Sequence, residues 1–425
     1  MTPATTAEGR SRNLILAAMI FAVSMTFIDQ TIISISVPHI QRELGLSATG
    51  VQWAVNAYLL ALAALFAFGG RLAGTLGHRA MVTLGVALIA VSRPETAYRP
   101  ARMNYRGLAL IVAGVGLWVF GFQQSSIWGW RNPAIAARIA TGLVLLVTFY
   151  LVERRTGSPL VDVSIFGIRP FLVENLVLWL TLLAFVPVFF FAAQYAQISL
   201  GQSPLKASLI LLCFSAGFVA AAQVGGRMLD RVGAKAPVVA GCVLAAAGLW
   251  LWAVKMTDLS LSAQAGYVIV AGAGMGLMLG PANTDAVNRA SHLAYGEATG
   301  ITQTVRNYSA SLGIAVLGTI LVFQTRSQVT SSLTALSVPS RQAAAQAARI
   351  AQSQGGASTV AAIPRFVRLD FAHASRTVFL VMAGIMAAAA LIACTGLRQG
   401  RQQEPGEPQV APESGAPREE IRCRP

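Results

Sequence analysis

Long apolar runs, separated by short polar gaps, follow one another along most of the chain. A bilayer core of about 30 Å requires roughly 20 apolar residues in a helix, so runs of that length predict membrane-spanning helices. Ten runs are long enough, and they cover residues 14–37, 51–70, 107–127, 134–152, 171–193, 205–225, 237–254, 263–282, 300–323 and 374–394. The first is too long for the apolar core of a signal peptide, so we expect an uncleaved span. The pattern predicts an all-α, polytopic integral membrane protein whose helices form a bundle.

Residues 81–91 form a further apolar run of 11 residues, which reaches only about 16 Å as a helix. If this short segment does not cross the bilayer, both termini lie on the same side of the membrane. Most basic residues of the short loops then lie on that side too, as the positive-inside rule favours. If it crosses, by snorkelling and local thinning, the loops around Arg154 and Arg227 are forced outside. We therefore expect about ten full spans plus one short segment in the cell's inner (plasma) membrane, with both termini cytoplasmic.

Composition and charge exclude several classes of protein. Of the 425 residues, 55% are hydrophobic and 12% are charged, whereas a soluble domain is about 25% charged. The net charge of +15 comes from Lys and Arg in the gaps between apolar runs, so it indicates topology and no nucleic-acid partner. The four cysteines lack C-x-x-C spacing and the four histidines are scattered, so we expect no metal site. Because the chain has no phosphate-binding loop, we expect no nucleotide and no cofactor, and energy from an ion gradient.

The runs and gaps also predict a domain organisation. A cytoplasmic N-terminal segment (1–12) precedes a first helix bundle (13–92), a basic loop (93–106) and a linker helix pair (107–152). A six-helix bundle (171–395) contains a long polar extracytoplasmic loop (324–373), in which the Ala-rich stretch 341–352 predicts a surface helix. The tail (396–425), rich in Pro, Glu and Arg, is expected to be disordered and cytoplasmic.

Asp29 is the strongest candidate for chemistry, because it lies deep in the first span. An unpaired ionised acid at that depth costs several kcal/mol, so it is expected to face a cavity and to bind a proton readily. The alternative is an acid that packs between helices and is hydrogen-bonded to a neighbour. In the span at 300–323, Arg306 with Gln303 and Asn307 either lines a cavity or snorkels to the headgroups.

Other polar and small residues suggest structural roles. Glu174 lies near the start of its span, which favours headgroup contact, and Asp285 is expected at the cytoplasmic edge. The glycines of one late span predict close helix packing; they are Gly272, Gly274, Gly276 and Gly280.

A loop of one type occurs twice, each time after an apolar span, which indicates an internal repeat of two related halves. Its glycines allow a tight turn, and an acid near a helix end can pair with arginines and latch one conformation. The candidate latch residues are Gly70, Arg71, Gly77 and Arg79 in the first copy and Gly226, Asp230, Arg231, Gly233 and Lys235 in the second.

These motifs together resemble the fourteen-span drug:proton antiporter branch of the major facilitator superfamily. The resemblance rests on Asp29-x-Thr31 followed by Pro38, on the repeated loop, and on segments 159–162 and 197–204. It implies a major facilitator type bundle that exports amphipathic small molecules or drugs by proton-coupled alternating access, in contact with membrane lipid. In this interpretation Asp29 carries the proton, and a substrate cavity is lined by Asp29, Thr31, Gln303, Arg306 and Asn307.

The sequence departs from the family pattern in its first half. The first loop has Gly74 and Thr75 where the family has an acid and an arginine, so the latch is retained only at Asp230 and Arg231. After Val91 the chain passes almost directly to a stretch like the one before the family's seventh helix, and family helices 4 to 6 have no counterpart. An inactive remnant, a gene model with an internal deletion, or a membrane scaffold or sensor are the alternatives. An intramembrane enzyme is disfavoured, since no nucleophile or metal constellation is present.

Overall fold

The computed structural model describes residues 57–59, 104–128, 132–156, 169–288, 295–353, 364–397 and 400. The predictions for Asp29, Thr31, the first copy of the repeated loop, the short segment and the tail beyond residue 400 lie outside these residues. Every regular element in the described ranges is a helix, as the long apolar runs predicted.

The helices follow the predicted spans closely. They are α4 (Tyr105–Trp128), α5 (Pro133–Glu153), α6 (Arg169–Ile198), α7 (Pro204–Val232), α8 (Lys235–Lys255), α9 (Leu261–Asn288), α10 (Tyr295–Ala335), α11 (Ser340–Ser353) and α12 (Arg365–Gly396), with a 3₁₀ turn, η2, at Met256–Asp258. Seven of the described helices are long and apolar enough to cross a membrane, namely α5 to α10 and α12; the apolar part of α4, Arg106–Phe122, is shorter.

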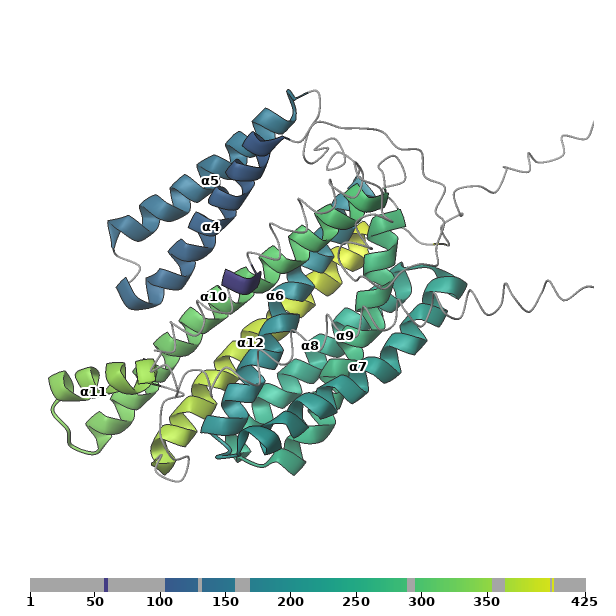
Figure 1. The fold of residues 1–425 in the computed structure, drawn as a ribbon. Coiled ribbons are helices and arrows are strands. Elements are labelled where there is room, and N and C mark those ends of the chain that lie inside the picture. Colours follow the sequence, from purple (N-terminus) through teal and green to yellow (C-terminus); the bar gives the residue numbers. More distant parts are fainter. Residues whose placement is uncertain are drawn as a thin grey trace, which may run out of the picture.

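Six of these helices, α6 to α10 and α12, lie side by side in one bundle, and α4 and α5 form a hairpin beside α10 (Figure 1). The α6 helix is the inner helix, because every residue from 181 to 200 is buried. Leu59, on the second predicted span, is buried in the same hydrophobic cluster as α6, so that part of the first half packs against the second.

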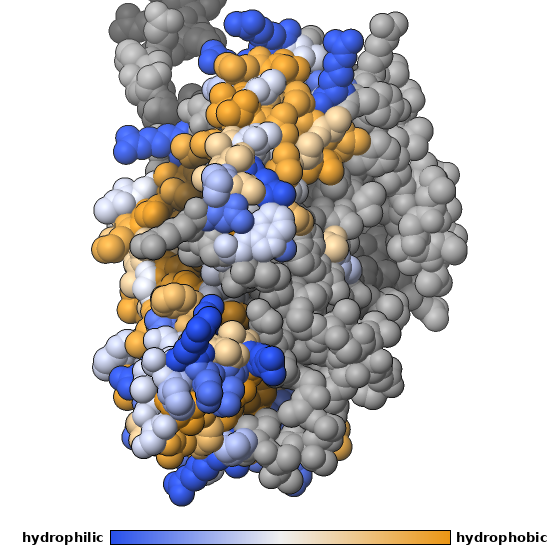
Figure 2. Space-filling model, turned by 90° about the vertical axis from the view of Figure 1, so that its left-hand side faces the viewer, coloured by the Kyte–Doolittle hydropathy of each residue, from blue (hydrophilic) through white to orange (hydrophobic). Residues whose placement is uncertain are grey.

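The α5 helix lies at the periphery and exposes an apolar face. Leu143, Val144, Val147 and Leu151 are exposed at roughly helical spacing. In Figure 2 hydrophobic side chains gather over the upper part of the face that carries the α4–α5 hairpin, and hydrophilic ones are frequent at the lower end. Such a surface is stable in lipid and costly in water.

Glycines allow α9 to pack closely on two neighbours. A methyl group at Gly272 or Gly276 would overlap the backbone of α7 at Phe214 or Phe218, and one at Gly274 would overlap α8 at Ala245. The prediction of close packing is confirmed for these three glycines. It is wrong for Gly280, where no described atom lies within 4 Å of the position that a methyl group would take.

The polar segment 324–373 is largely helical. The α10 helix continues past its apolar run to Ala335, and α12 begins at Arg365. Between them the Ala-rich stretch forms α11, which folds back along the end of α10 (Figure 1) and packs on it through Val329, Leu333, Ala343 and Ala347. The apolar runs therefore predicted the apolar parts of α10 and α12, but both helices are longer than those runs.

Candidate functional site

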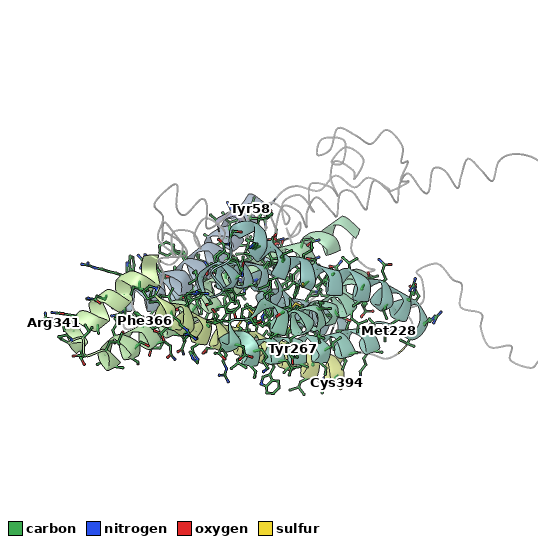
Figure 3. All side chains as sticks on the ribbon, turned by 90° about the horizontal axis from the view of Figure 1, so that it is seen from below. Tyr58, Met228, Tyr267, Arg341, Phe366 and Cys394 are labelled. Carbon is green, nitrogen blue, oxygen red and sulfur yellow. The ribbon has the colours of Figure 1, made fainter. Side chains whose placement is uncertain are left out.

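The helix directions define two ends of the bundle. The first end holds the start of α6, the turn that joins α7 to α8, the end of α9 and the start of α10, and the charge bias predicts that it is cytoplasmic. The second end holds the turns from α6 to α7 and from α8 to α9, together with α11. In Figure 3 Met228 marks the first end, and Arg341 and Phe366 mark the second.

Among the predicted cavity residues that the structure describes, Arg306 is the one that forms a hydrogen bond to another helix. Its Nη1 donates a hydrogen bond to Oδ1 of Asn283 in α9, at 3.3 Å. Asn307, by contrast, is buried and donates to the carbonyl oxygen of Gln303 in its own helix, at 2.9 Å. Gln303 is half-buried one turn closer to the first end. The structure therefore brings Arg306 and Asn283 together, and sequence reasoning missed Asn283 because no pattern along the chain joins positions on two different helices.

The position of Arg306 on α10 follows from the contacts of α10 with α6. The Ser309 hydroxyl donates to the carbonyl oxygen of Trp179, and Gly313 lies against the carbonyl oxygen of Leu183. Positions 306, 309 and 313 repeat at the three- and four-residue spacing that places side chains on one helix face. Arg306 thus continues the stripe of α10 that faces the interior of the bundle, one turn nearer its first end.

Two buried carboxylates lie near the same end. The Thr181 hydroxyl of α6 contacts Sδ of Met278 in α9, at 3.8 Å. Glu174 lies seven residues before Thr181 on α6, and Asp285 lies seven residues after Met278 on α9. Both acids are therefore displaced toward the first end. Seven residues are about two helical turns, so these acids lie on the facing sides of α6 and α9.

Glu174 is fully buried and Asp285 is 2% exposed. The headgroup contact expected for Glu174 is therefore wrong. The error arose because distance from a helix end measures depth along the bundle axis and does not indicate which side of the helix a residue occupies.

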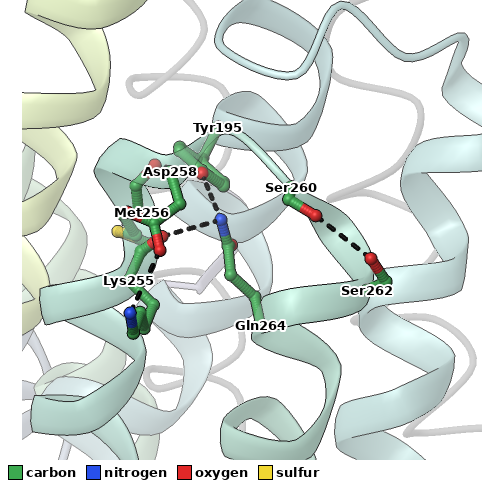
Figure 4. Close-up of polar contacts among 7 residues, drawn as sticks. All are labelled: Tyr195, Lys255, Met256, Asp258, Ser260, Ser262 and Gln264. Carbon is green, nitrogen blue, oxygen red and sulfur yellow. Dashed lines mark hydrogen bonds and ion pairs between the residues drawn. The ribbon is translucent and has the colours of Figure 1, made fainter.

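A hydrogen-bonded network joins three helices at the second end (Figure 4). Gln264 of α9 donates from Nε2 to the Tyr195 hydroxyl of α6, at 2.7 Å, and to the Lys255 carbonyl oxygen, at 3.1 Å. The Tyr195 hydroxyl donates to the Met256 carbonyl oxygen at 2.6 Å, and Trp252 Nε1 of α8 donates to Gln264 Oε1 at 3.1 Å. Sequence reasoning missed this network, in which each polar group of the buried Gln264 has a partner.

The α12 helix is held at the same end by further contacts. The ring of Trp252 packs edge to face on Phe379, with centroids 4.5 Å apart. Arg368 donates from Nε to the carbonyl oxygen of Ser199 at 2.8 Å, and the Ser332 hydroxyl of α10 donates to Asp370 Oδ1 at 2.9 Å. These contacts join α6, α8, α9, α10 and α12 into one unit at the second end.

The second copy of the repeated loop forms the turn between α7 and α8. Asp230 and Arg231 are exposed on the last turn of α7 and, within the described ranges, neither forms an ion pair. Gly233 ends the helix with φ of 84°, a backbone conformation that favours glycine, and Lys235 begins α8. Gly226 is exposed, with room around it. The turn chemistry is as expected, and the latch stays a prediction.

In the part of the chain that the structure describes, no three His, Cys, Asp or Glu side chains come together as metal ligands. The cysteines described there, Cys213, Cys242 and Cys394, are free thiols.

Comparison with known proteins agrees with this architecture. The sequence model of the Major Facilitator Superfamily matches residues 19–94 and 94–314. The chain is 25% identical to the tetracenomycin C resistance and export protein of Streptomyces glaucescens, over 75% of this chain and 78% of that protein. It is 24% identical to the multidrug efflux pump LfrA of Mycolicibacterium smegmatis, over 89% and 93%, and 25% identical to the cephamycin export protein CmcT of Amycolatopsis lactamdurans, over 71% and 84%.

Among solved structures, a bacterial homolog of the human lysosomal transporter Spinster, in an inward-facing and occupied conformation, aligns with a TM-score of 0.46. The two chains are 15% identical, and the alignment covers 90% of this chain and 96% of that one.

Proposed function

The chain belongs to the Major Facilitator Superfamily of membrane transporters, and on that premise we propose that it exports amphipathic small molecules in exchange for protons. The transporter resides in the plasma membrane with both termini in the cytoplasm. It uses the proton gradient in place of a bound cofactor or nucleotide, and it has no enzymatic activity.

The proposed substrate class rests on one observation. Three similar proteins, from three genera, are named for the export of tetracenomycin C, the export of cephamycin and multidrug efflux. The composition of the chain supports the same class, since a cavity within an apolar bundle accepts molecules with a large apolar surface and few polar groups.

Asp29 is the proposed proton carrier. An acid deep in a span is protonated more readily than one in water, because the bilayer disfavours the ionised form. Proton binding from outside and release to the cytoplasm then alternate with substrate binding, so that each conformation of the transporter is favoured by one of the two ligands. In the same proposal Thr31, two residues after the acid, also contributes to the lining of the cavity.

Contacts within the described half support a mechanism in which that half moves as one body. The contacts at the second end join five helices, and the glycines of α9 hold α7, α8 and α9 in close contact. Alternating access by rocking requires each half to move as a unit around the central site. In this proposal the Asp230–Arg231 turn contacts the first half in one of the two conformations.

A second candidate is a related membrane protein that does not transport. The family match is interrupted at residue 94. The alignment with the Streptomyces glaucescens protein is 419 residues long, but it includes only 75% of this 425-residue chain. Part of the alignment is therefore a gap in this chain. Both observations support a shortened first half, as expected if family helices 4 to 6 are missing. A short first half presents less surface to close the cavity, so export is expected to be weak or absent in this candidate.

Export from an efflux-deficient bacterial strain separates the two candidates. Cells that produce the chain are loaded with a panel of fluorescent amphipathic dyes, and dye retention is followed with and without a protonophore. Protonophore-sensitive loss of dye, relative to cells with an empty vector, is expected for a proton-coupled exporter. Retention equal to that of the vector control, with the protein present in the membrane fraction, would exclude the exporter and favour the non-transporting candidate.

A further inference from the structure

Arg306 has one hydrogen-bond partner in the described part of the chain and no ion-pair partner there. A guanidinium group has five N–H donors and remains charged. The structure gives it a single hydrogen bond, from Nη1 to Oδ1 of Asn283 at 3.3 Å. An amide oxygen is neutral, so the positive charge of Arg306 is oriented by Asn283 without being neutralised.

The location of this charge favours a binding site over snorkelling. Arg306 is half-buried on the stripe of α10 that faces α6, next to Ser309 and Gly313. A snorkelling arginine extends along its own helix toward the headgroups, whereas Arg306 reaches across to α9. Because a cation held inside the bundle has lost part of its hydration, it requires an opposite charge in return.

The two buried acids that the structure describes near this end, Glu174 and Asp285, do not meet this requirement. Asp285 is two residues from Asn283, which places it about 200° around α9, on another side of that helix. Asp285 and Glu174 lie on the facing sides of α6 and α9, and neither is within ion-pair distance of Arg306 among the described contacts. A carboxylate delivered by a ligand fits the remaining donors, since two parallel N–H groups of arginine match its two oxygens.

We propose that Arg306, oriented by Asn283, binds an anionic group of the substrate, so that the transporter selects amphipathic molecules that carry a carboxylate. The inference rests on the proposed export function and names the substrate class of that site. The pair lies near the predicted cytoplasmic end, where an exporter takes up its substrate. Asn283 acts as a positioning residue, and Arg306 makes the contact.

A matched pair of dyes tests the inference. Rhodamine B carries a free carboxylate, and rhodamine B ethyl ester has the same ring system with that group blocked. Export of each dye is measured in the efflux-deficient strain for the wild type, R306Q, R306K and the control K206Q, which removes an exposed cation at the other end of the bundle. Binding of each dye to the purified protein is measured by fluorescence anisotropy, which needs no turnover.

We expect the wild type and K206Q to export rhodamine B faster than the ester. In R306Q the affinity for rhodamine B should fall about tenfold or more, as for the loss of a charge-assisted hydrogen bond, while ester binding is unchanged. R306K, which retains the charge without the planar donor pair, should be intermediate.

Three results would overturn the inference. One is a wild type that binds and exports the ester to the same extent as rhodamine B; this result would leave the export function intact. Another is an R306Q variant that loses both dyes equally, which indicates a structural role. The third is the absence of any Arg306-dependent preference in binding. If the wild type binds rhodamine B in preference to the ester through Arg306 but exports neither dye, the site is supported and the export function fails.

Discussion

Gly313 of α10 lies against the backbone carbonyl oxygen of Leu183 in α6. This is the oxygen that would accept the helical hydrogen bond from residue 187, and that residue is a proline, which has no N–H to donate. Gly225 of α7 lies in the same way against the carbonyl oxygen of Leu277 in α9, four residues before Pro281. In both places a glycine on one helix allows close approach to a carbonyl group that a proline on the other helix leaves without its usual donor.

The first prediction concerns this close approach. Gly225→Ala and Gly313→Ala should each destabilise the protein by about 1–3 kcal/mol, because the added methyl group overlaps a backbone carbonyl and forces the helices apart. Thermal unfolding of the detergent-purified protein measures the effect as a lower midpoint. The matched control is Gly226→Ala, at the adjacent position, where nothing described lies within 4 Å. Equal midpoints for Gly225→Ala and Gly226→Ala would contradict the proposed packing.

The second prediction concerns the buried network at the second end. Tyr195→Phe removes the hydroxyl that accepts from Gln264 and donates to the Met256 carbonyl oxygen. The expected loss of stability is about 1–3 kcal/mol, since buried polar groups are left without partners. The control is Ser260→Ala, which removes one member of the exposed Ser260–Ser262 contact and should leave the unfolding midpoint unchanged. A Tyr195→Phe variant as stable as the wild type would show that the network does not hold this end together.

The third prediction concerns Asp29. Asp29→Asn should abolish uptake driven by a pH gradient into inverted membrane vesicles while membrane insertion is retained, because the amide cannot take up and release the proton. The comparison variant is Asp258→Asn, which removes an exposed acid that is 3.2 Å from Lys255 outside the bundle. Uptake is followed as substrate fluorescence after the gradient is imposed. Unchanged coupling in Asp29→Asn would remove this residue from the mechanism.

The fourth prediction is topological. Residues 81–91 are expected not to cross the bilayer, so that positions 92 and 96 lie in the cytoplasm with the basic loop. Ser92→Cys and Thr96→Cys, in a background without native cysteines, should be labelled by a membrane-impermeant maleimide only after the membrane is opened. Ser260→Cys, in the turn between α8 and α9, is the control for outside labelling. Labelling of Ser92→Cys in intact cells would show that the short segment crosses.

The sequence alone determined the class of protein and the positions of its helices. Apolar runs of membrane-spanning length are a local property, and the runs at 171–193, 237–254 and 374–394 correspond to α6, α8 and α12. Motif spacing along the chain was sufficient to identify the family and to locate the turn at Gly233. Helix ends were less accurate, because α10 and α12 continue as polar helices beyond the bilayer, where hydropathy no longer marks them.

Only the tertiary structure decided which polar residues meet. Glu174 and Arg306 both lie near the starts of their spans. The neighbours that they meet come from α9, which is remote in sequence from α6 and directly precedes α10. In an apolar bundle nearly every face of a helix is hydrophobic, so periodicity does not separate the interior from the lipid. The rotation of each helix is set by the close contacts of glycines such as Gly313 and Gly276 with backbone oxygens, and that rotation brings Asn283 to Arg306 and Gln264 to Tyr195.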